Sequence, residues 1–139
     1  MIVLDTNVIS ALMQHEPDPR VVAWLDDQPS ESIWTTAITM FEVRFGLELL
    51  ADGRKRRRLE AAFTAALDED FAGRVLPFDR NAADAAGLIA ARQRKRGRTV
   101  EIRDVQIAGV VAARKATLAT RNGRHFEGLG LKLVDPWAA

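Results

Sequence analysis

Short apolar runs alternate with longer helical segments along this chain, and this alternation constrains the fold more than any other feature. The runs with the character of strands lie at 2–4, 32–35, 74–78, 117–120 and 131–134. Short apolar strands of this kind suit a sheet that is covered by helices on both faces, which is the usual setting of parallel strands. The sequence therefore predicts an α/β fold with a mainly parallel central sheet.

The segments between these runs predict the helices. We expect them at 8–13, around 20–27, and at 37–50, 54–68, 81–96 and 105–114. The N-cap of the first would be Thr6 or Asn7, and that of the third Thr36 or Thr39. Pro77 ends its strand or places it at a sheet edge. The chain has 139 residues and shows no repeat or linker, so a single domain over 1–139 is expected.

Composition excludes several classes of protein. The absence of cysteine rules out disulfides, thiolate metal sites and thiol nucleophiles. No apolar stretch approaches the ~18 residues of a membrane span. Asp5 interrupts the first apolar run after four residues, so no signal peptide is visible and a soluble cytoplasmic protein is expected. Phosphate-binding glycine loops, paired histidines and a nucleophile elbow are also absent.

The charges are segregated along the chain. The chain has 20 Lys and Arg against 19 Asp and Glu, a net charge of +1, yet basic residues concentrate at Arg54–Arg58 and Arg92–Arg98. The first stretch opens a predicted helix, where positive charge opposes the helix dipole. Two interpretations remain open: the stretches guide RNA, or they are solvated helix faces.

Polar residues follow two of the predicted strands directly. Asp5 comes after the first strand, and Thr120 and Asn122 stand at the end of the strand 117–120. In open parallel sheets, ligands bind beyond the carboxyl ends of the strands. The alternative is that Asp5 caps a helix and that the other two residues form an ordinary turn.

Two further acids lie in predicted helices. Glu42 interrupts a largely apolar helix, where an unpaired buried carboxylate is costly. Thr39 and Gly46, three residues before and four after it, leave room for a ligand on that face, although simple exposure is an alternative. Asp104 opens the most apolar helix, where the helix dipole alone would favour an acid. Glu101 could interact with the helix dipole instead, and a single acid would be enough for that purpose.

The three acids together favour a particular metal chemistry. Clustered carboxylates without cysteine, and with only two histidines in the chain, fit Mg²⁺ or Mn²⁺ better than zinc. Carboxylates brought together would repel one another without a cation. A divalent ion among them would activate a water and stabilise charge that develops on a phosphate.

Four segments resemble, in order, the hallmarks of the PIN-domain family. MIVLDTNVIS (1–10) has an apolar strand followed by Asp, Thr and Asn. TTAITMFEVRFGLELL (35–50) has an apolar helix with a Glu before an Arg/Phe/Gly segment, and IRDVQIAGVVAA (102–113) has an Asp opening an alanine-rich helix. LATRNGRHFEGLGLKLVDPW (118–137) resembles the ending of the VapC-like branch, which includes FitB-type and plasmid-stability toxins. The resemblance covers essentially the whole chain.

The resemblance implies a three-layer α/β/α fold and a Mg²⁺- or Mn²⁺-dependent endoribonuclease that attacks RNA with a metal-activated water. It implies the toxin of a toxin–antitoxin pair, neutralised by a small VapB-like antitoxin that often binds DNA. It further implies a homodimer, and higher assemblies with the antitoxin on DNA. The metal-binding, catalytic acids carry over to Asp5, Glu42 and Asp104. Asn7 carries over as a residue that orients Asp5, and Thr120 as a polar residue of the site.

One position departs from the family pattern. Many PIN domains place a fourth acid where this chain has Asn122, which offers a carbonyl oxygen but no charge and would be a weaker ligand. Arg44 or Arg103 would approach the phosphate, or else pair with a neighbouring acid. Two other functions stay open: a PIN nuclease outside any toxin–antitoxin system, and a catalytically silent module that binds nucleic acid or protein.

Overall fold

A computed structural model describes all residues from Met1 to Ala139. Five strands form one sheet in the order β3-β2-β1-β4-β5, and every neighbouring pair is parallel. The strands are β1 (Ile2–Leu4), β2 (Ile33–Thr36), β3 (Val75–Leu76), β4 (Thr117–Ala119) and β5 (Lys132–Val134). The predicted parallel α/β sheet is confirmed, and β3, which ends before Pro77, is an edge strand as expected.

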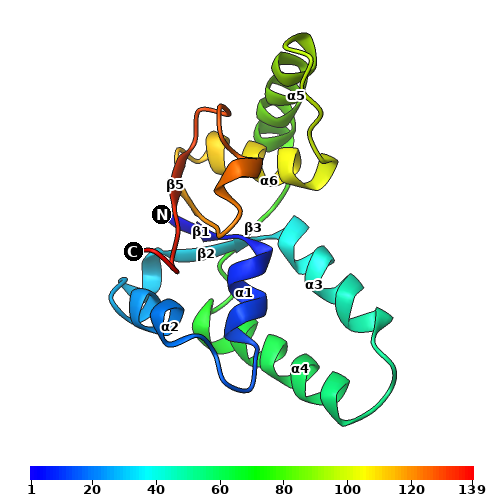
Figure 1. Cartoon of the computed structure of the whole chain (residues 1–139), viewed down its shortest axis with the longest axis vertical. Helices are drawn as coiled ribbons and strands as arrows, with labels where there is room; N and C mark the ends of the chain where they lie inside the picture. The colour runs from blue at the N-terminus through cyan, green and yellow to red at the C-terminus, as the bar shows by residue number, and fades with distance from the viewer.

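Six helices cover the two faces of this sheet. They are α1 (Thr6–Leu12), α2 (Pro19–Asp26), α3 (Ala37–Leu49), α4 (Arg54–Ala65), α5 (Arg80–Lys95) and α6 (Ile102–Ala113). Figure 1 shows α5 and α6 on one side of the strands and α1, α2 and α4 on the other. The fold therefore has the three layers α/β/α that the sequence led us to expect. No helix combines the length and apolar character that crossing a membrane requires.

The central strands contribute to two separate hydrophobic cores. Successive side chains of a strand point to opposite faces, so Leu4 packs among α1 to α4 while Val3 packs with α5 and α6. Leu118 and Ala119 of β4 alternate in the same way, and all four side chains are fully buried. This double burial is the reason that the central strand β1 is apolar along its whole length, whereas the edge strand β5 carries the exposed Lys132.

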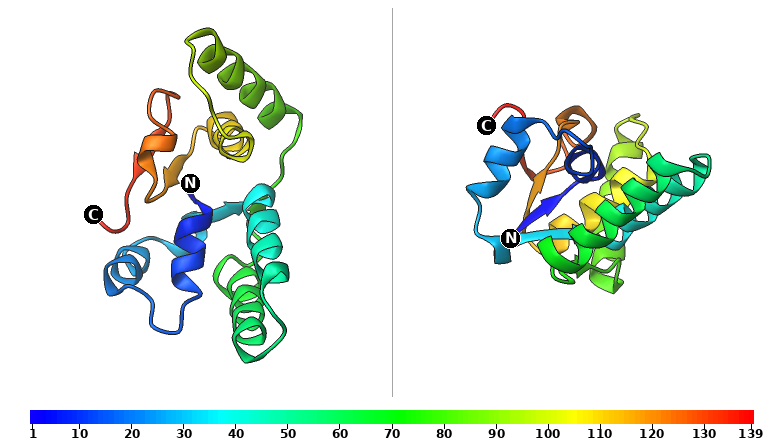
Figure 2. Two further views of the ribbon diagram at one scale, coloured as in Figure 1. Left: turned by 45° about the vertical axis from the view of Figure 1, so that its right-hand side comes forward. Right: turned by 90° about the horizontal axis from the view of Figure 1, so that it is seen from below.

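Helices α5 and α6 approach each other closely at Gly109. A Cβ atom on this residue would lie 2.5 Å from the carbonyl oxygen of Ala82 and 2.6 Å from the Cβ of Ala86. Only a glycine fits there, and the contact holds α6 against α5 in the layer that Figure 2 shows from two further sides. The position of the first turn of α6, which carries Asp104, follows from this packing.

Two predicted helix starts were wrong by two or three residues, whereas those at 37 and 54 were confirmed. The first helix begins at Thr6 rather than at 8, because Asp5 is its N-cap and accepts a hydrogen bond from the Thr6 N–H at 2.8 Å. The last helix begins at Ile102 rather than at 105, because Glu101 caps it. Thr36 caps α3, as one of the two expected alternatives, by accepting a hydrogen bond from the Thr39 N–H at 3.0 Å.

The helix expected at 54–68 is also shorter than predicted. Its α-helical part ends at Ala65, and the chain continues through a wider π-helical turn at Ala66–Asp70. The turn lets Phe71 bury its ring in the core shared by α1 to α4. The requirement to bury this side chain is tertiary, which is why local helical pattern alone missed the change.

Candidate active site

The order of the strands creates a crevice beside Asp5. From β1 the chain builds outward to β2 and β3, then returns to the other side of β1 with β4 and β5. In such sheets the crevice for ligands opens at this reversal, beyond the carboxyl ends of the two central strands. Leu4 of β1 pairs in register with Ala119 of β4. Asp5 and Thr120, the next residues of each strand, therefore meet in the crevice.

A network of hydrogen bonds holds the Asp5 carboxylate. Oδ1 accepts from the Thr6 N–H at 2.8 Å, and Oδ2 accepts from the Thr120 hydroxyl at 2.8 Å and from Asn7 Nδ2 at 3.2 Å. The Asn7 side chain is anchored in turn, because its Oδ1 accepts from the Arg121 N–H at 3.1 Å. Asp5 is thus both the helix cap and an oriented carboxylate, and the two interpretations of this residue do not exclude each other.

Burial makes the Asp5 charge unfavourable despite these hydrogen bonds. The residue is only 5% exposed, and its loss of hydration raises the pKa of the carboxyl above its ordinary value, against the opposing effect of the hydrogen bonds from Thr120 and Thr6. A cation next to Asp5 would offset this cost.

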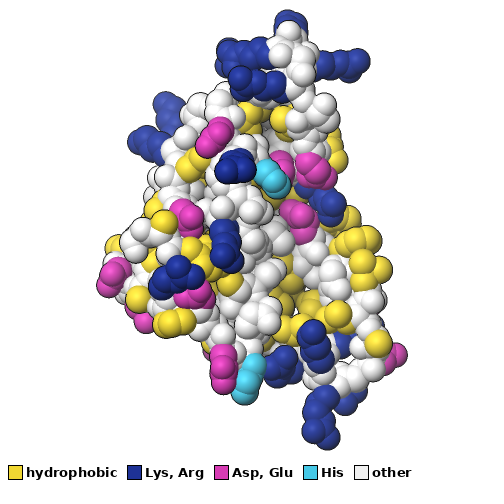
Figure 3. Space-filling model, in the orientation of Figure 1, with side chains coloured by type: hydrophobic (Ala, Val, Ile, Leu, Met, Phe, Trp, Pro, Cys, Tyr) yellow, Lys and Arg dark blue, Asp and Glu magenta, His cyan; other side chains and the backbone are white.

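Glu42 and Asp104 reach the same cavity as Asp5 from two other helices. The cavity has a volume of about 520 Å³, and no hydrophobic residue lines it. Figure 3 shows acidic side chains and a histidine gathered at the middle of this face. The residues that line the cavity are Asp5, Thr6, Asn7, Ser10, Glu42, Glu101, Arg103, Asp104, Asn122 and His125.

Glu42 lies on α3, and its carboxylate faces the start of α1. Its Oε1 accepts a hydrogen bond from the Thr6 hydroxyl at 3.0 Å, and its Oε2 lies 3.8 Å from the Arg103 guanidinium. Burial raises the pKa of Glu42, and the negative charges of Asp5 and Asp104 raise it further. Glu42 therefore does not lie on a purely solvated stripe.

Asp104 is free of the capping role that offered a simpler explanation for it. Glu101 performs that role, because one of its carboxylate oxygens accepts from the N–H groups of Arg103 at 2.8 Å and Asp104 at 3.0 Å. The Asp104 carboxylate instead lies 3.3 Å from Nδ1 of His125. Burial and the charge of Asp5 raise the pKa of Asp104.

The three carboxylates are chemically suited to a hard cation, although they do not form a complete coordination shell. Their side chains offer only oxygen donors. Burial raises the pKa of all three, and the charges of neighbouring acids add to the rise for Glu42 and Asp104. No three acidic or histidine side chains lie close enough together to enclose an ion directly. Glu42 is engaged by Thr6 and Arg103 instead. The donor set fits Mg²⁺ or Mn²⁺, and its geometry leaves space for water between acids and ion.

The structure separates the two arginines expected near the phosphate. Arg103 lines the cavity and pairs with Glu101 at 3.2 Å. Arg44 does not reach the cavity, and its Nη1 lies 3.7 Å from Glu48 and 3.9 Å from Glu60. On a helix, positions 42 and 44 face different directions, so Arg44 takes the alternative role of pairing with acids.

The residue expected as a weaker ligand lies at the mouth of the cavity. Asn122 lines it, and its backbone N–H donates to the Thr120 hydroxyl at 3.0 Å. Sequence analysis missed the contribution of Thr6, Ser10 and His125 to this cavity. The position of Thr6 beside Asp5 was a usable signal. No local signal pointed to His125, because only the turn after β4 brings it to Asp104.

The two basic stretches differ in their surroundings. Arg56 of the first stretch pairs with Glu48, Asp52 and Glu60 at 2.6, 3.1 and 2.8 Å. Residues of the second stretch form no salt bridge, and in Figure 3 they make a group of basic side chains over the end of α5.

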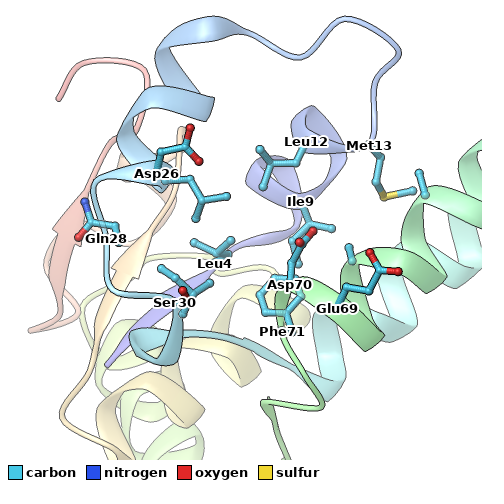
Figure 4. Close-up of a pocket in the computed structure, with 14 residues that line it drawn as sticks. Leu4, Ile9, Leu12, Met13, Asp26, Gln28, Ser30, Glu69, Asp70 and Phe71 are labelled. Carbon is cyan, nitrogen blue, oxygen red and sulfur yellow. The ribbon is translucent and has the colours of Figure 1, made fainter.

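A second, apolar pocket lies on the other side of α1. Its volume is about 340 Å³, and Figure 4 shows Ile9 and Leu12 of α1, with Met13 directly after the helix, facing it. Acidic side chains stand at its edge: Asp26, Glu69 and Asp70. Helix α1 thus presents Thr6, Asn7 and Ser10 to the acid cavity and its apolar residues to this pocket.

Comparisons with known proteins match the whole of this architecture. The family model described as PIN domain matches residues 2–130. The chain is 42% identical to the VapC ribonuclease Y4jK of Sinorhizobium fredii over 141 residues, covering 99% of this chain and 98% of the relative. It is 36% identical to the toxin FitB of Neisseria gonorrhoeae, covering 99% of each.

Solved structures lead to the same family. A chain in the structure of FitAB bound to an IR36 DNA fragment superposes with a TM-score of 0.89 at 36% identity, covering 99% of this chain and 96% of that one. The family model covers more than half of the present sequence, and the two relatives named above span it almost entirely. The chain therefore belongs to the PIN-domain family.

Proposed function

We propose that this chain is a single-domain, metal-dependent endoribonuclease that acts as the toxin of a VapBC-like toxin–antitoxin pair. The observation that carries the nuclease proposal is the meeting of Asp5, Glu42 and Asp104, from three separate segments, in one wholly polar cavity at the carboxyl edge of the sheet. Three carboxylates gathered in this way repel one another and so lower the stability of the fold. A bound cation would remove that repulsion and could act on a phosphate substrate.

Asp5, Glu42 and Asp104 would hold Mg²⁺ or Mn²⁺ directly or through water, with the carbonyl oxygen of Asn122 as a weaker ligand. An ion bound there would lower the pKa of an attacking water and offset the charge that develops on the scissile phosphate. Retention of three of the four family acids favours a nuclease over a catalytically silent binding module.

The remaining residues of the cavity orient these groups. Thr120 and Asn7 fix the direction of the Asp5 carboxylate through their hydrogen bonds to Oδ2. Thr6 does the same for Glu42. The guanidinium of Arg103 is 39% exposed and lies at the edge of the cavity, in position to contact a phosphate oxygen of the substrate.

The test is cleavage of a panel of RNAs by the purified chain with Mg²⁺ or Mn²⁺, with EDTA and the variant Asp5→Asn as controls. Asp18→Asn is the matched variant, because Asp18 also caps a helix, α2, by accepting the Arg20 N–H, but lies outside the cavity. We expect cleavage to disappear with EDTA and in Asp5→Asn, and to persist in Asp18→Asn. Full activity of a folded Asp5→Asn protein would exclude the metal assignment.

The toxin role rests on the relatives and on the apolar pocket. One relative is named a toxin, and a matched structure contains FitAB on DNA. We propose that a small, DNA-binding antitoxin docks on this chain by placing an apolar side chain in the pocket of Figure 4. The acids at its edge, Asp26, Glu69 and Asp70, favour neighbouring basic residues on that partner.

We also propose a homodimer, which would bind the antitoxin and DNA as a larger assembly. Helix α3 exposes a stacked pair, Phe41 and Phe45, whose ring centroids lie 6.1 Å apart, and Leu49 is 71% exposed beside them. Figure 3 shows this hydrophobic group at the side of the molecule. An exposed patch of large apolar side chains is typical of an interface between protein chains.

Expression of the chain alone, and together with a candidate small antitoxin, tests the toxin role. We expect growth arrest by the chain alone, rescue by the antitoxin, and a stable complex of the two in size-exclusion chromatography with light scattering. Cleavage of RNA without growth arrest or complex formation would favour a PIN nuclease outside any toxin–antitoxin system.

A further inference from the structure

We infer that a second polar cavity, adjoining the acid cavity, is a subsite for the nucleotide next to the scissile phosphate of a single-stranded RNA. This inference rests on the proposed ribonuclease function. The cavity has a volume of about 500 Å³ and lies between the α5–α6 connection and the turn that follows β4. Ligand pockets in proteins commonly have volumes of about 300–1,000 Å³, so it can take one nucleotide.

The two cavities adjoin each other. Glu101, Asp104 and His125 line both of them. A phosphate held beside Asp104 would therefore have its neighbouring sugar and base at the entrance to the second cavity. A separate small metabolite would not need this connection to the acids, whereas a polymer that passes through the cleavage site must extend beyond it.

Two arginines give the second cavity positive charge that is available to a ligand. Arg98 and Arg124 line it, and neither takes part in a salt bridge; around these cavities the ion pairs are made by Arg103 and His125. Arg98 extends over Gly128, where an added Cβ atom would lie 3.0 Å from its Nη1. Unpaired guanidinium groups placed in this way suit the phosphates of a nucleic-acid backbone.

A buried carboxamide in the same cavity suits a base. Gln93 is only 3% exposed, and its Nε2 donates to the Gly128 carbonyl oxygen at a long 3.5 Å. Its Oε1 accepts no hydrogen bond within the chain and is not fully buried. A carboxamide that burial holds in place, with an unpaired oxygen in the lining of the cavity, can read the donor pattern of an unpaired base.

The rest of the lining agrees with a hydrated, polar ligand. Only two of its ten residues, Val100 and Leu129, are hydrophobic. Glu127 adds an acceptor for the exocyclic amino group of a base, and the hydroxyl of Thr99 adds a further polar contact. The second cavity thus offers arginines for phosphate groups and a carboxamide for the edge of a base, and it adjoins the acid cavity. These features together point to a nucleotide of the RNA substrate as its ligand.

The first experiment compares two double variants that each remove two positive charges. Arg98→Gln with Arg124→Gln alters the subsite, whereas Arg94→Gln with Lys95→Gln removes charge from the end of α5 outside the cavity. The probe is a random-sequence, single-stranded RNA dodecamer, cleaved in Mn²⁺ over a range of NaCl concentrations. We expect kcat/KM to fall about tenfold in the subsite variant and less than twofold in the other. In a plot of log kcat/KM against log NaCl concentration, the slope of the subsite variant should become shallower by about 0.7 for each phosphate contact that is lost.

The second experiment measures the base preference of cleavage around the cut site. The cut sites in the same RNA pool are sequenced for the parent, Gln93→Glu and Gln93→Met, with thermal unfolding to confirm that each variant is folded. Gln93→Glu removes the donor of the carboxamide, and Gln93→Met removes both donor and acceptor. We expect a changed base frequency at one position beside the cut in both variants, with the other positions unaffected.

The outcomes separate this inference from the function on which it rests. If the parent cleaves RNA but the subsite double variant matches the Arg94/Lys95 variant, and the folded Gln93 variants keep the cut profile of the parent, the subsite alone is overturned. If the parent and all variants fail to cleave any RNA under metal, the nuclease proposal falls and the subsite falls with it. Loss in the subsite variant together with a changed cut profile supports both.

Discussion

The acid cavity and the apolar pocket lie on opposite sides of one short helix, α1, and differ in almost every other respect. No hydrophobic residue lines the first, whereas nine of the fourteen residues around the second are hydrophobic. The first costs stability through charge repulsion, and the second through exposed apolar surface. The proposed metal and the proposed protein partner would each relieve one of these costs. Catalysis and partner binding should therefore be separable on this chain by single substitutions.

The largest expected effect concerns an acid of the cavity. Asp104→Asn should lower the rate of RNA cleavage by about 100- to 1,000-fold, the usual loss when a group that stabilises the transition state is removed. Binding of the antitoxin through the apolar pocket should not change.

The matched control for Asp104 is Asp79→Asn. Asp79 also lies at a helix start, where it accepts the Ala82 N–H at 3.0 Å, but it does not line the acid cavity. Cleavage assays and calorimetric titration of the antitoxin measure both effects. Equal loss of activity in the two variants would show that a general effect of removing a charge near a helix start, and not the cavity, accounts for the loss in Asp104→Asn.

The next largest effect should come from filling the apolar pocket. Ala62 of α4 lines it, and Ala62→Phe should weaken antitoxin binding by about 100-fold, or about 2.7 kcal/mol, since buried anchor contacts of this kind dominate interfaces. RNA cleavage should stay within about twofold of the parent, because the acid cavity lies beyond α1.

Ala61→Phe is the control for this change, because Ala61 is the exposed neighbour on the same helix and does not line the pocket. It should leave antitoxin binding unaltered. A tight complex with Ala62→Phe would place the partner elsewhere on the molecule.

A smaller effect should distinguish the two arginines. Arg103→Ala should lower kcat/KM about tenfold through loss of a charge-assisted contact to phosphate, whereas Arg44→Ala should change it less than about twofold, as expected of an exposed ion pair. Steady-state kinetics on one RNA measures both. A larger loss for Arg44 than for Arg103 would contradict the separation seen in the structure.

The smallest effect concerns stability and pH. Burial raises the pKa of Asp5, so the folded state holds a proton more tightly than the unfolded state. The metal-free protein should therefore gain stability as pH falls through the raised pKa of Asp5 toward the ordinary value of 3.8, as far as this group is concerned. Metal-free Asp5→Asn should lack this contribution and unfold a few degrees higher than the parent at pH 7.

Thermal unfolding with and without Mn²⁺ provides the measurement. Added Mn²⁺ should stabilise the parent, because a ligand that binds only the folded state favours it, and should not stabilise Asp5→Asn. A parent that is less stable at pH 5 than at pH 7, with Asp5→Asn behaving identically, would contradict the assigned cost of the buried carboxylate.

The strands were predicted from sequence alone because a strand buried on both faces is largely apolar, which is a local signal. The positions of Asp5, Glu42 and Asp104 each had a simpler structural explanation, and the resemblance of four segments to one family is what selected the three acids together. Arg44 and Arg103 were indistinguishable in sequence, since the face of the helix on which each lies depends on packing. The apolar pocket was not foreseen for the same reason: α1, α2 and α4 assemble it from residues whose patterns are those of an ordinary core.

The position of α1 between the two sites has a consequence for regulation. Its first residues carry the network around Asp5, and its opposite face forms one wall of the apolar pocket. If a partner in the pocket favours one placement of this helix, and the metal favours another, the two ligands oppose each other. By thermodynamic reciprocity, the factor by which the partner weakens metal binding equals the factor by which metal weakens the partner. Cellular Mg²⁺ would then set how tightly the chain is held in its silenced form.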